Sequence, residues 1–328
     1  MKPTAGARPR IVRRAVHGVL LLDKEAGVSS NAALQRAKRL YRAEKAGHTG
    51  TLDPLASGLL PLCFGAATKF AQAGLDADKR YLATLRLGVT TTTGDLEGEV
   101  VRTVPDVAID RPALERACAK FVGAIEQVPP MHSALKRDGK PLYEYARAGI
   151  ELEREPRRVR IHALRVVDGS GDLWTIDVSC SKGTYIRTLG EDIGAALGCG
   201  AHLAALRRTG SGALGLDAAL GLAELDGLDE ATIDARLLPP DALVSALPRV
   251  VLSADDAGRF LAGVRRRIAL ADAPALRIYG PEPGAFLGTG HVTAGELIST
   301  RLLSPAEVGD LVAAARRQPL PVFESLPA

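Results

Sequence analysis

Apolar positions along the first two thirds of the chain predict both strands and helices. His17–Leu22 is a short apolar run typical of a buried strand, and Tyr81–Leu87 alternates between apolar and polar residues like a half-buried strand. Ser29 and Ser30 are suitable helix N-caps. The residues that follow them place apolar side chains at helical spacing: Ala33, Ala37, Leu40 and Tyr41.

Further along, the same patterns continue without a strict strand–helix–strand rhythm. Pro112–Phe121 is predicted to be helical, and Arg157–Val167 and Trp174–Cys180 are predicted to be strands. Thr184 is a candidate cap for a helix that ends near Leu197, before Gly198. Between these elements, Asp138-Gly139 predicts a hairpin turn. This mixture favours an α+β fold.

The last part of the chain changes character after three prolines, Pro239, Pro240 and Pro248. Short apolar segments broken by Gly and Pro follow, and they predict a small β-rich domain. These segments are Leu276–Tyr279, Ala285–Gly290 and Glu296–Thr300. We expect a disordered basic tail at residues 1–16 and a catalytic domain at residues 17–246, with an insertion at about 128–156. A C-terminal domain at residues 247–318 and a short tail at residues 319–328 should follow.

Composition narrows the class of protein. The chain has 328 residues, of which 46% are hydrophobic and 24% charged, an ordinary globular composition. No apolar run is long enough to span a membrane, and the basic first sixteen residues contain no apolar signal region. The cysteines lack disulfide or zinc spacing, which predicts buried thiols, no metal and a reducing cytoplasm. They are Cys63, Cys118, Cys180 and Cys199.

Charge is distributed unevenly along the chain. The formal net charge is only +4, but residues 1–48 carry eleven Lys and Arg side chains, four of them in the cluster 36–42. Residues 217–241 are acidic, with Arg236 as the one base. A basic face fits a phosphate-rich partner, although a solvated helix face explains the same pattern.

The segment with the most chemical information is Gly47–Gly58, which reads Gly-His-Thr-Gly-Thr-Leu-Asp-Pro-Leu-Ala-Ser-Gly. Its glycines permit unusual backbone conformations, and Pro54 restricts Asp53 to an extended one. Asp53 is therefore a candidate nucleophile, general base or metal ligand, while a cap in a turn is the plain structural alternative. The phosphate-binding Gly-x-x-x-x-Gly-Lys pattern is absent, and no second carboxylate flanks Asp53 in the sequence.

This segment and five others resemble, in order, the motifs of the TruB-type tRNA pseudouridine synthases, which modify the T-loop uridine at position 55 of tRNA. The matching segments are His17–Asn31, Gly47–Pro61, Lys79–Gly88, Val128–Gly149, Cys180–Gly194 and Ala201–Gly212. Residues 249–300 are similar to the PUA RNA-binding domain. The resemblance implies a mixed or antiparallel central sheet flanked by helices and a small C-terminal β-barrel-like domain.

The resemblance also implies roles for individual residues. Asp53 matches the nucleophilic aspartate, Tyr81 the tyrosine that packs on the target base, and Arg187 the arginine that pairs with the aspartate. Tyr185 and Leu206 match positions lining the uridine pocket. A histidine that inserts into the T-loop corresponds to His48. By charge, Lys24 and the cluster 36–42 are predicted to contact phosphate.

The first motif departs from the family pattern. The family usually has Asp-Lys-Pro-x-Gly there, whereas this chain has Asp23-Lys24-Glu25-Ala26-Gly27. Glu25 loosens the turn and adds a negative charge near the expected RNA path. The segment Val128–Arg147 resembles the family's insertion that closes on the T-arm. Its prolines and glycine turn are also compatible with an ordinary surface loop.

Isomerising uridine exchanges no electrons or groups with a cofactor, so none is expected. The target nucleotide must be flipped out of its stack. Attack of Asp53 on C1′, attack on C6, and a glycal route with Tyr81 as proton acceptor all remain open. The resemblance implies tRNA as the partner and a monomer without an obligatory protein partner or membrane. Two other functions remain as alternatives: a tRNA-remodelling protein and a guide-RNA-dependent synthase subunit.

Overall fold

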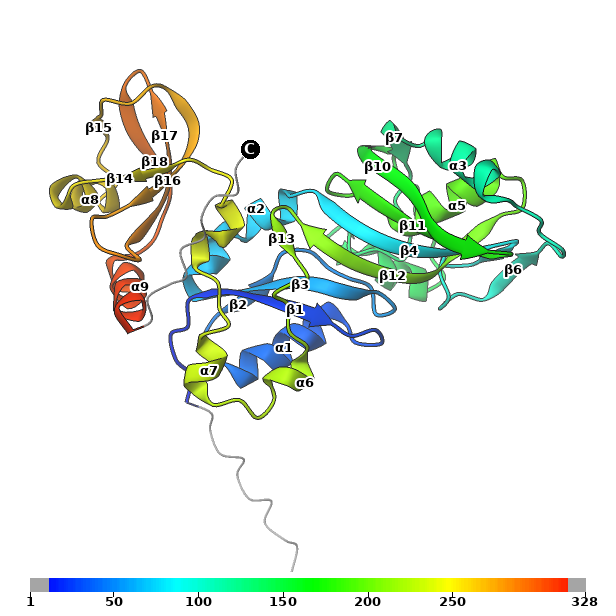
Figure 1. Ribbon diagram of the computed structural model, residues 1–328, viewed down its shortest axis with the longest axis horizontal. Helices are drawn as coiled ribbons and strands as arrows, with labels where there is room; N and C mark the ends of the chain where they lie inside the picture. The colour runs from blue at the N-terminus through cyan, green and yellow to red at the C-terminus, as the bar shows by residue number, and fades with distance from the viewer. Residues whose placement is uncertain (1–11, 318–328) are drawn as a thin grey trace, which may run out of the picture.

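The computed structural model describes residues 12–317, which form two separate β-sheets with helices around them (Figure 1). Within this range, nine strands build the larger sheet: β1 (Gly18–Lys24), β2 (Ala46–His48), β3 (Ser57–Phe64), β4 (Lys79–Leu87), β7 (Gly123–Gln127), β10 (Arg157–Ser170), β11 (Leu173–Cys180), β12 (Ala201–Ser211) and β13 (Leu214–Gly215). The smaller sheet contains β14 (Arg249–Val251), β15 (Arg266–Arg267), β16 (Ala273–Tyr279), β17 (Phe286–Thr293) and β18 (Glu296–Leu302).

Helices and two short hairpins surround these sheets. The helices are α1 (Ser30–Leu40), α2 (Ala71–Asp76), α3 (Arg111–Ala119), α4 (Leu142–Arg147), α5 (Ile186–Ala196), α6 (Leu222–Leu225), α7 (Glu230–Asp234), α8 (Ala254–Leu261) and α9 (Pro305–Arg317), with 3-10 helices at Gly65–Phe70 and Pro240–Val244. The hairpins pair β5 (Val89–Thr91) with β6 (Val100–Thr103) and β8 (Lys136–Arg137) with β9 (Lys140–Pro141).

The larger sheet has the strand order β1-β3-β12-β4-β11-β10-β7, and β2 and β13 pair with β3 and β12. Its pairs are antiparallel except for β3 with β12. The helix α5 packs on β4 and β12, and α3 packs on β10. Buried side chains of α1 and α5 join those of the strands in one apolar core, as their helical spacing requires.

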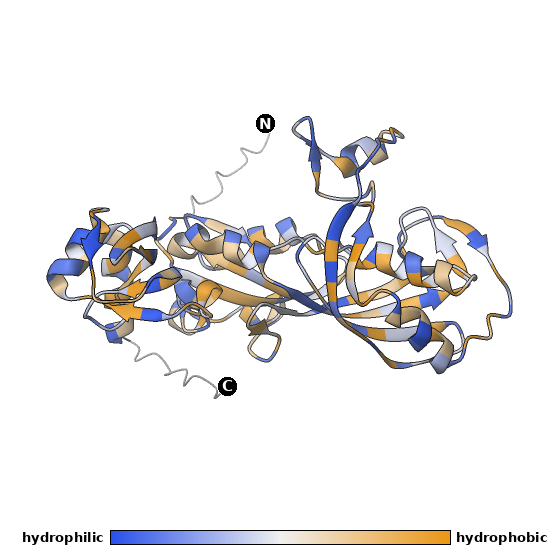
Figure 2. Cartoon of the chain, turned by 90° about the horizontal axis from the view of Figure 1, so that it is seen from above, coloured by the Kyte–Doolittle hydropathy of each residue, from blue (hydrophilic) through white to orange (hydrophobic). Residues whose placement is uncertain are grey.

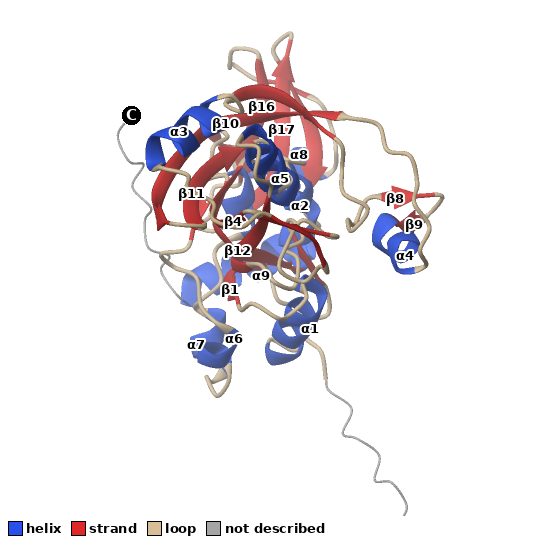
Figure 3. Cartoon of the chain, turned by 90° about the vertical axis from the view of Figure 1, so that its right-hand side faces the viewer, coloured by secondary structure: helices blue, strands red, loops and turns tan. Residues whose placement is uncertain are grey.

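The segment between β7 and β10 projects from the body of the molecule and carries β8, β9 and α4 (Figures 2 and 3). Asp138 and Gly139 both have positive φ, 51° and 80°, as a two-residue hairpin turn of this kind requires. The predicted hairpin is therefore confirmed. Because its elements contact the sheet little, the segment is joined to the fold mainly through its two ends.

The smaller sheet is attached to the catalytic part by a buried polar contact and by aromatic packing. Asp241 accepts hydrogen bonds from Arg277 Nη1 at 2.8 Å and from the Tyr279 hydroxyl. The rings of Phe70 and Phe286 pack with centroids 5.2 Å apart. These contacts fix the C-terminal sheet against the 3-10 helices of the larger part.

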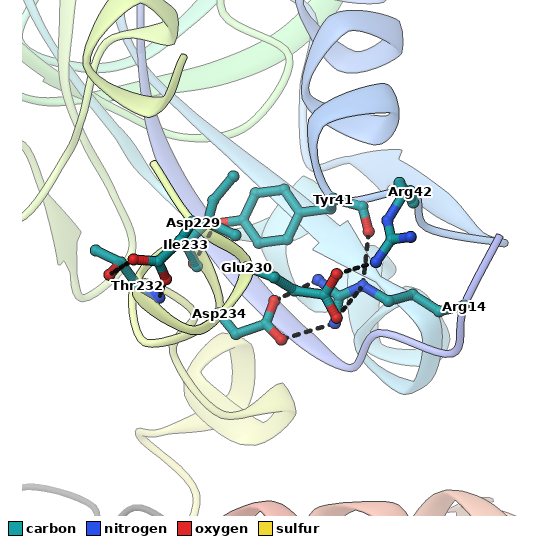
Figure 4. Close-up of polar contacts among 8 residues, drawn as sticks. All are labelled: Arg14, Tyr41, Arg42, Asp229, Glu230, Thr232, Ile233 and Asp234. Atoms are coloured by element: carbon teal, nitrogen blue, oxygen red, sulfur yellow. Dashed lines mark hydrogen bonds and ion pairs between the residues drawn. The ribbon is translucent and has the colours of Figure 1, made fainter. Parts of the chain in front are cut away.

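The chain before β1 is held against α7 (Figure 4). Arg14 makes two hydrogen bonds to the Asp234 carboxylate, at 2.7 and 2.6 Å, and the buried Tyr41 hydroxyl donates to the Ile233 carbonyl at 2.8 Å. Residues 12–16 of the predicted tail therefore contact the domain, and we propose that the catalytic domain includes them. Residues 1–11 and the predicted tail 319–328 lie outside the described residues, and the other domain bounds stay predictions.

The fold prediction is confirmed: the chain is α+β, with a mixed central sheet flanked by helices and a smaller C-terminal sheet. The four cysteines are buried free thiols, as predicted. Within residues 12–317, no helix is long and apolar enough to cross a membrane. The prediction for Thr184 is wrong, because Tyr185 is the N-cap of α5 and the Thr184 hydroxyl instead donates to the Ser181 carbonyl at 2.9 Å.

The Tyr41 contact yields a test of stability. Replacing Tyr41 with Phe removes the buried hydrogen bond from its hydroxyl to the Ile233 carbonyl, so the free energy of unfolding should fall by about 0.5–1.5 kcal/mol. Urea denaturation followed by circular dichroism measures the change. The control is Tyr143→Phe, at an exposed tyrosine on the projecting segment. Equal unfolding free energies for the two variants would contradict the assignment.

Candidate active site

Residues 49–56 form the loop between β2 and β3, which we call the catalytic loop. Ser30, the first residue of α1, both donates to the Leu52 carbonyl at 2.9 Å and accepts from the Leu52 amide at 2.8 Å. The Gly27 amide donates to the Pro54 carbonyl at 2.7 Å. Backbone groups on both sides of Asp53 are thus satisfied by the preceding helix and turn, which fixes the loop around that residue.

Asp53 lies beside a buried arginine. Asp53 Oδ2 is 3.1 Å from Nη2 of Arg187, which α5 carries in its first turn. The two side chains differ in exposure: that of Asp53 is 39% exposed and that of Arg187 is 5% exposed. A carboxylate held by a buried cation yet open to solvent on one side is available to a reactant.

Arg187 is itself held by backbone carbonyls from two other segments. Nη1 donates to the Thr93 carbonyl at 3.2 Å, and Nη2 donates to the His132 carbonyl at 2.6 Å. His132 lies at the beginning of the projecting segment, and Thr93 lies in the turn after β5. The guanidinium therefore has a fixed orientation toward Asp53.

A second carboxylate, Asp95, completes this arrangement and was not identified from the sequence. Asp95 Oδ2 is 3.6 Å from Arg187 Nε, and the Asp95 side chain is only 4% exposed. No motif marked Asp95, which lies in an ordinary Thr- and Gly-rich turn. Its burial beside a buried arginine becomes visible only when α5 and the β5–β6 turn are brought together.

Tyr81 is buried in β4, as the alternating pattern predicts. Burial raises the pKa of its hydroxyl, while the Arg208 guanidinium lowers it by its charge and by a hydrogen bond. The Asp53 carboxylate is close enough to raise the pKa further. Tyr81 and Asp53 are therefore near enough to interact electrostatically.

Tyr185 stands at the N-terminal end of α5 and is anchored by Gln127, a buried residue that sequence reasoning missed. The Tyr185 amide donates to Gln127 Oε1 at 3.0 Å, and Gln127 Nε2 donates to the Tyr185 carbonyl at 3.2 Å. Burial raises the pKa of the Tyr185 hydroxyl. Asp53 raises this pKa and Arg187 lowers it, so both charges are near enough to act on Tyr185.

Leu206 and His48 flank the catalytic loop. Leu206 is half-buried in β12 opposite Ala83 of β4, and it packs against the main core. His48 ends β2, directly before the loop, and burial lowers its pKa, helped by the charge of Arg208. Its Nδ1 is buried and has no hydrogen-bond partner within residues 12–317.

Lys24 lies beneath the loop rather than on the surface. It is 1% exposed, and its Nζ donates to the carbonyls of Glu25 at 2.8 Å, Val28 at 2.6 Å and Pro54 at 3.4 Å. Burial lowers its pKa to about 8, against the opposing effect of Asp53. This geometry favours a role for Lys24 in holding the turn that follows β1 and the catalytic loop, rather than contact with phosphate. The turn is retained although Glu25 replaces the usual proline.

The basic cluster 36–42 is partly neutralised by the acidic segment that follows β13. Arg36 pairs with Asp226 at 2.9 Å, and Arg42 pairs with Glu230 (Figure 4). Within residues 12–317, Lys38 and Arg39 form no ion pair. These two are the members of the cluster whose charge remains available to a phosphate.

The residues brought together support nucleophilic or acid–base chemistry by a single carboxylate. The Asp53 carboxylate raises the pKa values of both Tyr81 and Tyr185, and the charge of Arg187 lowers that of Tyr185. In the part of the chain that the structure describes, no group of three or more His, Cys, Asp or Glu residues is placed to hold a metal ion.

Three segments of the chain match known families. Residues 38–186 match the TruB family pseudouridylate synthase N-terminal domain. Residues 187–245 match the tRNA pseudouridylate synthase B C-terminal domain, and residues 248–303 match the pseudouridine synthase II TruB C-terminal family. Together these matches include Asp53, Tyr81 and Arg187.

Relatives and solved structures agree with this assignment. The chain is 54% identical to tRNA pseudouridine synthase B of Verminephrobacter eiseniae, over 97% of this chain and 98% of the relative. It is 58% identical to the protein of the same name from Burkholderia mallei, over 92% and 98%. The fold is similar to a chain in the crystal structure of a Cbf5-Nop10-Gar1 complex, with a TM-score of 0.67, 24% identity and coverage of 89% and 87%. The chain therefore belongs to the TruB family of pseudouridine synthases.

Proposed function

We propose that this protein converts a uridine of tRNA into pseudouridine and that Asp53 is its nucleophile. The observation that carries the proposal is the Asp53–Arg187 ion pair, 3.1 Å long, in which the arginine is buried and the carboxylate is half-exposed. The names of the relatives, tRNA pseudouridine synthase B, support tRNA as the substrate. They favour the enzyme over a tRNA-remodelling protein or a guide-RNA-dependent subunit.

The reaction breaks the N1–C1′ bond, turns the base and forms a C5–C1′ bond. C5 then loses its hydrogen as a proton, and N1 gains one, so atoms and electrons balance without an added redox group. A carboxylate must be ionised to act as a nucleophile. The positive charge of Arg187 lies next to the Asp53 carboxylate, with Nη2 3.1 Å from Oδ2.

The target nucleotide must leave its stack before Asp53 can reach it, at a cost of about a few kcal/mol. Aromatic side chains that stack on the flipped base return part of that cost. We assign this contact to Tyr81 and the walls of the base pocket to Tyr185 and Leu206. His48, whose buried Nδ1 has no partner within residues 12–317, is suited to bond to an RNA group.

We further propose that the modified uridine is that of the T-loop, at position 55, and that the projecting segment 128–156 contacts the T-arm. The beginning of this segment accepts a hydrogen bond from Arg187 at the His132 carbonyl, so the position of the segment is linked to that of the nucleophile. A monomeric state, a cytoplasmic location and RNA contact by the C-terminal domain stay predictions.

The role of Asp53 is tested by Asp53→Asn. The amide is a poor nucleophile but has a similar shape, so product formation should be abolished while tRNA affinity stays within about tenfold, or ~1.4 kcal/mol. Tritium release from tRNA labelled at uridine C5 measures the first, and filter binding measures the second. Asp172→Asn, at an exposed carboxylate paired with Arg86, is the matched control. Turnover by Asp53→Asn would exclude Asp53 as the nucleophile.

The role of Asp95 is tested by Asp95→Asn. The neutral amide no longer holds Arg187 by charge, so kcat should fall by about 10- to 100-fold with KM nearly unchanged. Asp177→Asn, which removes a partly exposed carboxylate paired with Arg165, provides the comparison. Equal kcat values for the two variants would mean that Asp95 does not orient Arg187.

The position of the target is tested with RNA. A tRNA in which cytidine replaces the T-loop uridine at position 55 should release no tritium, whereas an isolated T-arm hairpin with that uridine should react. Binding to both RNAs is measured in parallel. Tritium release from the substituted tRNA would show that the enzyme modifies another uridine.

A further inference from the structure

Arg208 is the largest of the fully buried side chains. It lies on β12 and is 1% exposed. Within residues 12–317, no carboxylate lies within ion-pair distance of its guanidinium. Burying a charge without a counter-ion costs folding free energy unless hydrogen bonds replace the lost water. The contacts of this guanidinium therefore indicate why a cation occupies the position.

Two of those contacts are backbone carbonyls, one in β3 and one at the beginning of the catalytic loop. Arg208 Nε donates to the Leu59 carbonyl at 2.7 Å, in β3, and Nη2 donates to the Gly50 carbonyl at 3.1 Å. Gly50 lies between His48 and Asp53. The side chain of Arg208 thus links β12, β3 and the beginning of the catalytic loop.

The third neighbour is Tyr81. Tyr81 is the register partner of Arg208 in the pairing of β4 with β12, so the two side chains lie on the same face of the sheet, and the charge of Arg208 lowers the pKa of the Tyr81 hydroxyl. A guanidinium has N–H donors and no acceptor. In a hydrogen bond between these two side chains the Tyr81 oxygen is therefore the acceptor, and its own O–H hydrogen is left for another acceptor.

We propose that Arg208 is a positioning residue that holds the Tyr81 hydroxyl as a hydrogen-bond acceptor and directs its O–H hydrogen toward Asp53 or the bound nucleotide. This inference rests on the proposed function. It gives Arg208 a role that neither the sequence motifs nor the Asp53–Arg187 pair assigns. It also defines the direction of the Tyr81 O–H hydrogen in any route in which that hydroxyl donates or accepts a proton.

The charges around Tyr81 agree with this role. Burial raises the pKa of the Tyr81 hydroxyl, and the nearby Cys180 thiol and Asp53 carboxylate raise it further. Arg208 is the group that opposes them, by its charge and its hydrogen bond. On its other sides the charge of Arg208 also lowers the pKa values of three bases, Lys24, His48 and Lys79.

The backbone of Arg208 has a structural role that can be separated from the role proposed for its side chain. Gly58 approaches the Arg208 backbone, and a Cβ added there would lie 2.3 Å from the Arg208 carbonyl oxygen. That close approach involves main-chain atoms and survives any change of the Arg208 side chain. Side-chain variants therefore test the contact with Tyr81 and the two carbonyl bonds, not the strand spacing.

The first experiment measures the single-turnover rate constant for pseudouridine formation with excess full-length enzyme, together with tRNA affinity. Arg208→Gln should lower the rate constant by about 100-fold, the scale of a lost proton-transfer arrangement, with affinity within about threefold of wild type. Arg207→Gln is the matched control, because Arg207 is the neighbouring residue of β12 and pairs with Asp23 instead. We expect its rate constant to stay within about twofold of wild type, on the scale of an exposed ion pair.

A double-variant cycle separates action through Tyr81 from general support of the loop. Arg208→Lys keeps the charge but not the planar donor fork, and it should lower the rate constant by about tenfold. In a Tyr81→Phe background the same change should have less than a threefold effect, because the hydroxyl it acts on is gone. The cycle also serves if Arg208→Gln fails to fold.

Each outcome decides a different question. Equal multiplicative losses in the two backgrounds would overturn the inference, since Arg208 would then act without Tyr81. A folded Arg208→Gln with a wild-type rate constant would overturn it as well. Absence of product from wild-type enzyme would instead overturn the proposed function and, with it, the role of Arg208 in that reaction.

Discussion

The narrow parallel contact between β3 and β12 joins the two halves of the central sheet. Only two register pairs form it, Ser57 with Arg207 and Gly58 with Arg208, and Gly58 has a φ of +98°. Any side chain at Gly58 would collide with the backbone of β12. Because the catalytic loop leads directly into β3, the position of Asp53 depends on this spacing. The glycine that closes the Gly47–Gly58 motif thus has a structural reason of its own.

Buried cations surround the one exposed carboxylate of the site. Arg187 contacts Asp53 directly, and Lys24 and Arg208 lie behind the loop, where their charges act on neighbouring groups. Their desolvation opposes folding, as the pKa of Lys24, lowered to about 8, indicates. Backbone carbonyls offset that cost by accepting their hydrogen bonds. The fold thereby keeps positive charges close to Asp53.

The site is assembled from segments that belong to different parts of the fold. Arg187 connects α5, the turn after β5 and the beginning of the projecting segment, through bonds to Thr93 and His132. Gln127 fixes the N-terminal end of α5 to β7. The segment that projects from the larger sheet is therefore tied, at its base, to the arginine that contacts Asp53. Closure of that segment on RNA would act at this point.

From the sequence alone, one could predict the α+β class, the helix after Ser29, the buried alternation around Tyr81 and the importance of the Asp53 loop. These features are local, because periodicity reports which side chains of one element face the core. The resemblance then placed Arg187 with Asp53, and the structure agrees. Asp95, Gln127 and the bonds of Arg208 were not predictable, and neither was the burial of Lys24. Arg208 and Gly50 lie 158 residues apart in sequence and meet only through strand order and register. Those are properties of the whole sheet, so only the tertiary structure decided which polar groups share the site.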